Sequence, residues 1–160
     1  MSISWGPKDD GKTAEKPGRL SQMALEKGVN EGRNGSGTIY VWASGNGGLV
    51  GDDCAADGYA SSVHSFTVSA VASDGSVPWA SDTQSVVTTN PGNTCTQNHT
   101  GTSAATPIAV GIIALGLEAN PQLTWRDIQH IAVWTADPSP SFTQTKRRLE
   151  NERGWISFPS

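Results

Sequence analysis

Residues His99–Pro107 read His-Thr-Gly-Thr-Ser-Ala-Ala-Thr-Pro and carry Ser103 into the first turn of an apolar segment that is predicted to be helical. The first turn of a helix holds unpaired backbone N–H groups and the positive end of the helix dipole, which stabilise a developing oxyanion. Ser103 is therefore a candidate nucleophile. The same residues also fit a helix N-cap, in which a hydroxyl accepts a hydrogen bond from a free N–H. On these residues alone the two interpretations are equally supported.

Asn46 is the second residue that is a candidate for a catalytic role. It lies in the run Val-Trp-Ala-Ser-Gly-Asn-Gly-Gly (41–48), which follows a short apolar strand pattern at 38–41. A glycine-rich turn lets the backbone approach a ligand closely, and the Asn46 amide can donate hydrogen bonds to a developing negative charge. The alternative is a turn-forming asparagine that tolerates positive φ.

Five segments in order support a resemblance: Ser2–Thr13, Trp42–Gly48, Cys54–Tyr59, His99–Pro107 and Leu123–His130. Together they closely resemble the catalytic domain of the kexin/furin proprotein convertases, within the subtilisin-like serine proteases. The resemblance covers residues 2–136 and implies an α/β fold, a subtilisin-like parallel sheet with helices on both faces. It implies that the chain corresponds to the C-terminal portion of such a domain, with residues 1–137 forming a partial peptidase S8 catalytic domain. Residues 138–160 are expected to be a divergent, disordered tail.

The resemblance also assigns roles. It implies that Ser103 is the nucleophile and that Asn46 binds the oxyanion. Ser4-Trp5-Gly6 resembles the edge that pairs with the substrate backbone, a β-augmentation mode, and these residues can at the same time form an ordinary strand.

The general base is missing from the recognisable motifs. The three histidines are His64, His99 and His130, and none matches the family's base. That base belongs to a His-Gly-Thr motif upstream of the Ser-Trp-Gly-Pro segment, and its orienting aspartate lies earlier still, so both are expected to precede Met1. The fragment is therefore expected to be inactive alone, unless His99 or His64 acts as the base.

Acidic residues gather in the Gly-rich loops, at Asp9, Glu15, Asp52, Asp53 and Asp57. Clustered carboxylates repel each other unless a cation lies among them, and a substrate arginine or a calcium ion would serve. The alternative for each is a solvated surface carboxylate. The resemblance implies that Asp9 and Asp57 bind the arginine before the cut and that Glu15 reads a basic residue three places upstream. It further implies that Asp9, Asp52 and Asp82 hold Ca²⁺.

Composition limits the class of protein. With 18 Gly, 9 Pro and 16% charged residues in 160, the chain suits a loop-rich α/β enzyme better than a helical bundle or a disordered chain. The net charge of −4 argues against a nucleic-acid partner. The longest apolar stretch, 107–117, is too short to cross a membrane, and no apolar segment typical of a signal peptide follows Met1. The resemblance nevertheless implies the secretory pathway, in the Golgi or secreted.

Hydrophobic spacing predicts strands at 2–5, 38–42 and 66–71 and helices at 18–32, 103–119 and 124–135. In the first helix the spacing places Leu20, Met23, Ala24 and Val29 on one face. The helix at 103–119 is nearly all apolar and is expected to be central and covered. This order favours a parallel sheet whose site lies at the carboxyl ends of its strands, where Asn46 falls. Between Asp82 and Val87 the chain is shorter than the family.

The two cysteines, Cys54 and Cys95, allow three states: a mutual disulfide, free thiols, or the loss of their partners, which the resemblance favours. In full-length form the expected activity is a serine endopeptidase of the kexin/furin type. Its substrates would be precursor polypeptides cleaved after paired basic residues. Two alternatives remain: a non-catalytic pseudoprotease fragment that binds basic peptides, and a partial gene product that does not fold.

Overall fold

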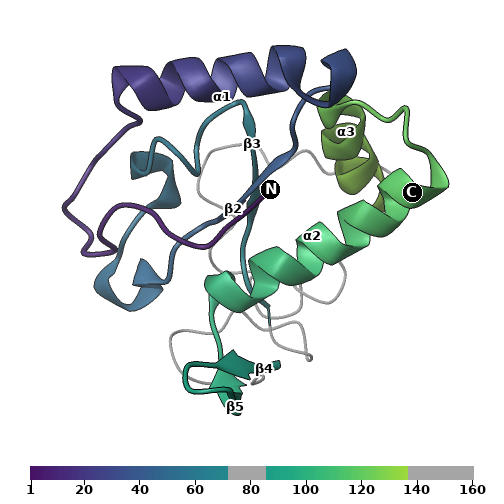
Figure 1. Cartoon of the computed structure of the whole chain (residues 1–160). Helices are drawn as coiled ribbons and strands as arrows, with labels where there is room; N and C mark the ends of the chain where they lie inside the picture. Colours follow the sequence, from purple (N-terminus) through teal and green to yellow (C-terminus); the bar gives the residue numbers. More distant parts are fainter. Residues whose placement is uncertain (72–85, 137–160) are drawn as a thin grey trace.

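The computed structural model describes residues 1–71 and 86–136 (Figure 1). Its centre is a three-stranded sheet of β1 (Ser2–Ile3), β2 (Tyr40–Ala43) and β3 (Ser65–Val68), in the order β1-β2-β3. All neighbouring strands are parallel, with Val41 aligned to Ser2 on one side and to Phe66 on the other. The predicted parallel sheet is confirmed.

Helices and turns connect these strands. The helix α1 (Arg19–Glu31) and the 3₁₀ turn η1 (Gly32–Gly35) join β1 to β2, and the 3₁₀ turns η2 (Gly47–Val50) and η3 (Cys54–Ala56) lie between β2 and β3. Farther along, the antiparallel hairpin of β4 (Val86–Asn90) and β5 (Thr94–His99) leads into α2 (Thr102–Ala119), which is followed by α3 (Trp125–Thr135).

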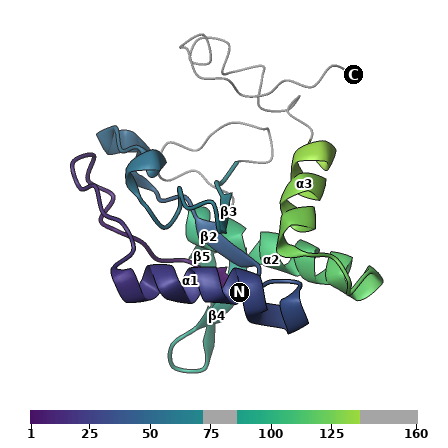
Figure 2. The ribbon, with the colours of Figure 1, turned by 90° about the horizontal axis from the view of Figure 1, so that it is seen from above.

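Alternation along β2 creates a core on each face of the sheet. Trp42 packs with Ile3 and Leu25 on the α1 side, whereas Val41 packs with Ile128 on the side of α2 and α3. Accordingly α1 lies on one side of the sheet and α2 on the other (Figures 1 and 2). The expected subtilisin-like arrangement, with helices on both faces of the sheet, is present.

The buried face of α1 differs from the predicted one. Leu25 and Val29 are buried, whereas Leu20 and Met23 are 81% and 52% exposed. The reason lies at Gly28, where a Cβ would come within 1.9 Å of the Tyr40 hydroxyl. The helix therefore approaches β2 along the side that bears Gly28 and Leu25, and the neighbouring stripe is left in solvent.

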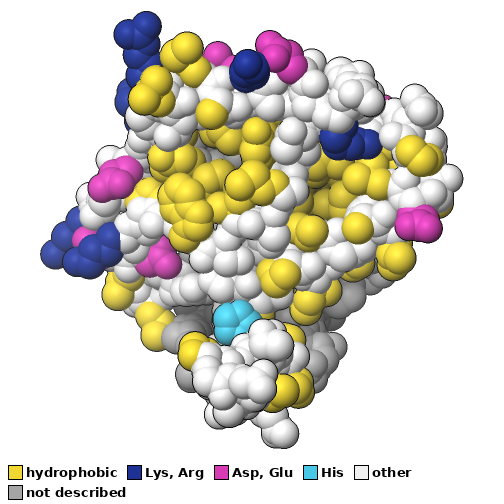
Figure 3. All heavy atoms as spheres, in the orientation of Figure 1, with side chains coloured by type: hydrophobic (Ala, Val, Ile, Leu, Met, Phe, Trp, Pro, Cys, Tyr) yellow, Lys and Arg dark blue, Asp and Glu magenta, His cyan; other side chains and the backbone are white. Residues whose placement is uncertain are grey.

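The expectation that α2 is covered was wrong for the part of the chain that the structure describes. Its stripe of Ile108, Ile112 and Leu115 is 53%, 66% and 73% exposed. The opposite face packs on the sheet through Val110, Ile113 and Leu117. Figure 3 shows apolar side chains gathered along α2 and in the space between α1 and α2.

Length and composition alone make α2 capable of crossing a membrane, since its 18 residues have a mean hydropathy of 1.5 with 17% of them buried. This differs from the expectation drawn from residues 107–117, because the helix also includes the flanking small residues. One such helix is weak support for a membrane span, since core helices of globular proteins pass the same test. The contacts of α2 with β1, β2 and β3 fit a core helix.

Two local features complete the fold. The helix α3 begins with a capping box, in which Thr124 and Asp127 exchange hydrogen bonds. These bonds hold the pKa of Asp127 below its usual range. The β4–β5 hairpin was not predicted, although Pro91-Gly92-Asn93 is a turn signal; Gly92 and Asn93 adopt φ of 80° and 59°.

Gly37 provides a test of the packing between α3 and the start of β2. It has a φ of +85°, and a Cβ there would lie 2.3 Å from Trp125 Cδ1 and 2.6 Å from the Val29 carbonyl oxygen. Gly35 also has positive φ, +90°, but opens to free space. We expect Gly37→Ala to lower the free energy of unfolding by about 1–3 kcal/mol more than the control Gly35→Ala, because only the former adds a clash to the backbone strain. Urea denaturation measures both, and equal losses would contradict the packing.

Candidate active site

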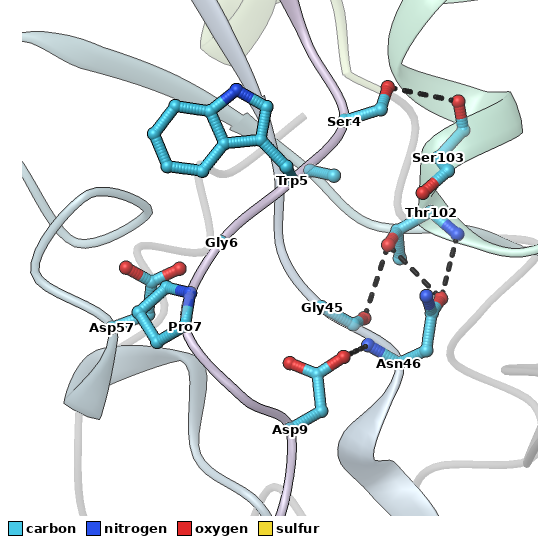
Figure 4. A pocket seen from close by; sticks show the side chains of 11 residues that line it. Ser4, Trp5, Gly6, Pro7, Asp9, Gly45, Asn46, Asp57, Thr102 and Ser103 are labelled. Atoms are coloured by element: carbon cyan, nitrogen blue, oxygen red, sulfur yellow. Dashed lines mark hydrogen bonds between the residues drawn. The ribbon is translucent and has the colours of Figure 1, made fainter. Parts of the chain in front are cut away.

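A pocket at the carboxyl end of β2 brings the predicted residues together. Asn46 follows β2, and Ser103 lies in the first turn of α2. Both line the pocket, and so do all but one of the predicted substrate-binding residues (Figure 4): Ser4, Trp5, Gly6, Asp9 and Asp57. The exception is Glu15. Segments that lie far apart in the sequence therefore meet in one site, as expected for the carboxyl edge of a parallel sheet.

Ser103 is not the N-cap of α2. Gly101 occupies that position with a φ of 85°, and no side chain caps the helix. Within the described part of the chain, neither the Ser103 hydroxyl nor its backbone N–H makes a hydrogen bond, while its carbonyl oxygen accepts one from Ser4 Oγ at 3.1 Å. The N-cap interpretation is therefore wrong. The half-buried hydroxyl and a free N–H at the positive end of α2 remain available for a ligand.

The Asn46 side chain has a defined orientation. Its Oδ1 accepts hydrogen bonds from Thr102 N at 2.9 Å and from Thr102 Oγ1 at 3.1 Å. A backbone N–H can only donate, so the amide oxygen must face Thr102 and the Nδ2 group must be the opposite end. No described residue accepts from this Nδ2. Asn46 thus presents two free N–H donors beside the first turn of α2.

Asp9 fixes the backbone of the same turn. Its Oδ2 accepts a hydrogen bond from Asn46 N at 2.8 Å. A Cβ on Gly45, whose φ is +97°, would come within 2.7 Å of Asp9 Oδ1, so this approach requires glycine. Asp9 therefore holds Asn46 from the backbone side while Thr102 holds its amide.

Asp57 is the second carboxylate of the pocket. Its Oδ1 accepts a hydrogen bond from Tyr59 N at 2.7 Å, and its Oδ2 faces Gly6, where a Cβ would lie 2.9 Å away. The ion pairs among the described residues are Lys8–Asp10 and Lys27–Glu31. Neither Asp9 nor Asp57 is therefore neutralised by a described side chain, and the pocket can accept a cationic group between them.

An aromatic cluster supports the Ser4-Trp5-Gly6 segment. Trp5 packs edge-on against Trp42 and Tyr59, with ring centroids 5.1 and 5.3 Å apart, and Trp42 Nε1 donates to the Trp5 carbonyl oxygen at 2.7 Å. Trp5 itself is 61% exposed. The segment is held rigidly while one large ring stays open to a ligand. Trp42, Tyr59 and Thr102 support the site and were not singled out from the sequence, because only the fold brings them to it.

Glu15 lies next to the site without lining the pocket. Its backbone forms a bridge with Asp57, and its carbonyl oxygen accepts a hydrogen bond from Gly58 N at 2.7 Å. Its side chain is exposed to solvent. The role predicted for Glu15 in reading a second basic residue stays a prediction.

The expected calcium ligands are described in part. Asp9 lies against Gly45, and Asp52 lies against Gly47, where a Cβ would be 2.6 Å from Asp52 Oδ2. Each carboxylate has one oxygen bonded to a backbone N–H, Asp9 Oδ2 to Asn46 and Asp52 Oδ1 to Asp53, which leaves one oxygen for a hard cation. No three His, Cys, Asp or Glu residues form a metal-binding group within 1–71 and 86–136. Asp82 lies outside the described residues.

No histidine lies at Ser103 in the part of the chain that the structure describes. All three histidines belong to the described part, and none lines the pocket. His99 is paired with Val86 in the hairpin, His64 packs near Trp125 with a centroid distance of 6.1 Å, and His130 lies exposed on α3. The alternative that His99 or His64 acts as the base has no support in this geometry.

The two cysteines are both exposed and unbonded, so the option of a mutual disulfide is wrong. Although the residue as a whole is exposed, partial desolvation of its thiol, with an added contribution from Asp53, raises the pKa of Cys54. This thiol is therefore protonated at neutral pH and is a poor nucleophile.

Comparison with known proteins identifies the family. The Peptidase_S8 model, described as the subtilase family, matches residues 1–155. The chain belongs to the subtilase family. The match extends past residue 137, so the boundary between a catalytic portion and a tail at 138–160 stays a prediction.

Relatives of this subtilase chain include furin and a related convertase. It is 48% identical to human furin and 47% identical to mouse proprotein convertase subtilisin/kexin type 4, in each case over 86% of the chain. It is also 46% identical to Endoprotease bli of Onchocerca volvulus, over 96% of the chain. The chain spans only 19%, 24% and 26% of the length of these three relatives. The resemblance to the kexin/furin group is confirmed.

The alignments also show positions that the chain lacks. The comparison with human furin extends over 154 positions and covers 86% of 160 residues, which is about 138 residues. About 16 positions of the relative therefore have no counterpart here. This shortfall agrees with the expectation that the chain is shorter than the family.

Proposed function

We propose that this subtilase chain forms the nucleophile-bearing part of a furin-type serine endopeptidase. Ser103 is the nucleophile, and its backbone N–H forms an oxyanion hole with the Asn46 side chain. The observation that carries the proposal is the orientation of Asn46: Thr102 holds its oxygen from two sides, so its N–H donors are free in the pocket that Ser103 lines. Donors fixed before the reaction are what stabilises a tetrahedral intermediate.

The reaction would proceed by acyl transfer. Ser103 Oγ attacks the scissile carbonyl carbon and loses its proton to a base, while the carbonyl oxygen becomes an oxyanion that accepts hydrogen bonds from Asn46 Nδ2 and Ser103 N. The base returns the proton to the leaving amine, and water then hydrolyses the ester on Ser103. No histidine lines the pocket, and we propose that the base and its orienting acid come from residues outside this chain. The chain alone is therefore proposed to be inactive.

We propose that the substrate residue immediately before the cleaved peptide bond has a basic side chain. Asp9 and Asp57 line the pocket with no described cation between them, and Trp5 offers an open ring. Arginine suits such a site, since its planar guanidinium pairs with carboxylates and stacks on aromatic rings. The proposed substrates are precursor polypeptides with paired basic residues, processed in the secretory pathway.

A second candidate function has one observation in its favour. A pocket with two carboxylates and no histidine would bind a basic peptide without cleaving it. Binding of an Arg-Arg peptide to the chain by itself, with loss of binding in Asp57→Asn, would support this pseudoprotease. Cleavage by a complete domain that contains the chain would overturn it.

Calcium is the proposed cofactor. Asp9 and Asp52 flank the loop that carries Asn46, each with a carboxylate oxygen free, and carboxylate oxygens are what Ca²⁺ prefers. Asp82 is proposed as a third ligand. When bound, the ion would neutralise these carboxylates and so stabilise the loop.

The first prediction concerns Asn46. In a complete catalytic domain that contains this chain, Asn46→Ala is expected to lower kcat by about 10²–10³-fold with little change in KM, because its donors act on the oxyanion and not on the bound substrate. Ser103→Ala is expected to abolish turnover. Steady-state kinetics with an Arg-Arg peptide measure both, with Asn30→Ala on the exposed side of α1 as the control. A rise in KM at unchanged kcat would show that Asn46 only shapes the turn.

The second prediction concerns substrate choice. Asp57→Asn is expected to lower kcat/KM for arginine peptides by about 10²-fold or more, because a desolvated guanidinium loses one of its two carboxylate partners. The kcat/KM for peptides with a neutral residue before the cleaved bond should change much less. As a control, Glu118→Gln on the exposed side of α2 should behave as wild type. An unchanged preference for arginine would remove Asp57 from the pocket for the basic side chain.

The third prediction concerns calcium. A ligand that binds only the folded state stabilises it by about 2.7 kcal/mol at 100 times its Kd. We expect calcium to raise the Tm of the complete domain relative to chelator, and Asp52→Asn to reduce that rise. Glu26→Gln on α1 serves as the control. Identical melting curves with calcium and with chelator would refute the site.

A further inference from the structure

Two tripeptides of the chain fit the acceptor pattern for N-linked glycans, Asn34-Gly35-Ser36 and Asn98-His99-Thr100. The other asparagines do not fit; Asn90, for example, is followed by Pro91. We propose that Asn34 and Asn98 carry N-linked glycans. The proposal rests on the secretory location that is part of the proposed function.

Asn98 lies where a glycan can be attached without disturbing the core. Its side chain is exposed on β5 and has no hydrogen-bond partner among the described residues, while its backbone N–H donates to Thr96 Oγ1 at 3.2 Å. The ladder of the hairpin is irregular at this point, since the register shifts between Val86 and Thr88. The hairpin projects from the N-terminal end of α2, away from the sheet (Figure 1).

Asn34 lies on the turn η1, at the opposite end of the molecule from the hairpin (Figure 1). It is exposed, with a φ of 56° that asparagine tolerates better than most residues. The turn is fixed by Arg33, whose guanidinium donates to the carbonyl oxygens of Gly37 and Pro121, both at 3.2 Å. The Asn34 side chain takes no part in these bonds, so a sugar there leaves the turn intact.

The chemistry is a group transfer from a lipid pyrophosphate-linked oligosaccharide, carried out by the transferase of the secretory pathway. The side-chain nitrogen of the asparagine attacks the anomeric carbon and forms a C–N bond. The bond between that carbon and the pyrophosphate oxygen breaks, the lipid pyrophosphate leaves, and one amide proton passes to a base of the transferase. The hydroxyl at the third position, on Ser36 or Thr100, is what the acceptor pattern requires.

The glycans would also define two solvent faces of the complete enzyme. Asn98 lies five residues before Ser103 in the sequence, so its glycan would stand on the hairpin that leads to the nucleophile. Any polypeptide that covers the exposed stripe of α2 in the complete enzyme must then leave room for the glycans at the Asn98 side of the hairpin and at the η1 turn.

The test uses the complete 160-residue chain behind a cleavable secretory leader, translated in the presence of microsomes. The wild-type chain is expected to show two successive decreases in electrophoretic mobility, one for each glycan, and both should disappear after treatment with peptide N-glycosidase. Asn34→Gln and Asn98→Gln should each lose one of these shifts, and the double variant should lose both. Thr100→Ala should match Asn98→Gln, whereas Thr100→Ser should retain the shift.

Asn90→Gln is the matched control, because Asn90 is an exposed asparagine of the same hairpin without the acceptor pattern, and it should behave as wild type. If protein that is imported and protected from added protease shows no mobility shift, the proposal is overturned. If only one of the two shifts is missing, the corresponding site is overturned. The mobility is measured on denatured protein, and the added leader directs the chain into the microsomes. The result therefore depends neither on folding nor on peptidase activity. Failure of the proposed function would appear separately, in the kinetics of Ser103→Ala.

Discussion

The site depends on one interaction, between the amide oxygen of Asn46 and the N–H and hydroxyl of Thr102. It joins the loop after β2 to the first turn of α2, and it decides which end of the Asn46 amide faces the pocket. Gly101 makes the approach possible, because a Cβ there would lie 2.8 Å from Asn46 Oδ1. Without this contact Ser103 and Asn46, the proposed nucleophile and oxyanion donor, would lie on separate elements with no fixed relation.

Local apolar patterns predicted the strands of the parallel sheet, whereas the resemblance to the kexin/furin group supplied most of the residues that line the pocket. Val41 and Trp42 alternate between two apolar layers, and the loop after them carries Asn46. For α1 the hydrophobic spacing was right for Val29 and wrong for Leu20 and Met23, because Gly28 sets the contact face. It was also wrong for α2, whose apolar stripe has no described partner. A pattern of residues reports that a face is apolar, but it does not report what covers that face.

The exposed apolar stripe lies on the same helix that carries Ser103 in its first turn. An apolar stripe this exposed normally marks an interaction surface. The relatives are about four to five times the length of the aligned part. In the proposed function, Ser103 is the nucleophile and its activation requires a base that the described residues do not place in the pocket.

The most direct measurement is covalent labelling of the complete catalytic domain with an arginine-bearing peptidyl phosphonate ester, followed by peptide mass spectrometry. Such a reagent phosphonylates a serine only where an activated hydroxyl and an oxyanion hole coincide. The account predicts a single adduct on Ser103, formed more slowly in Asn46→Ala. An adduct on another residue, or labelling of Ser103 at the same rate without the Asn46 amide, would contradict it.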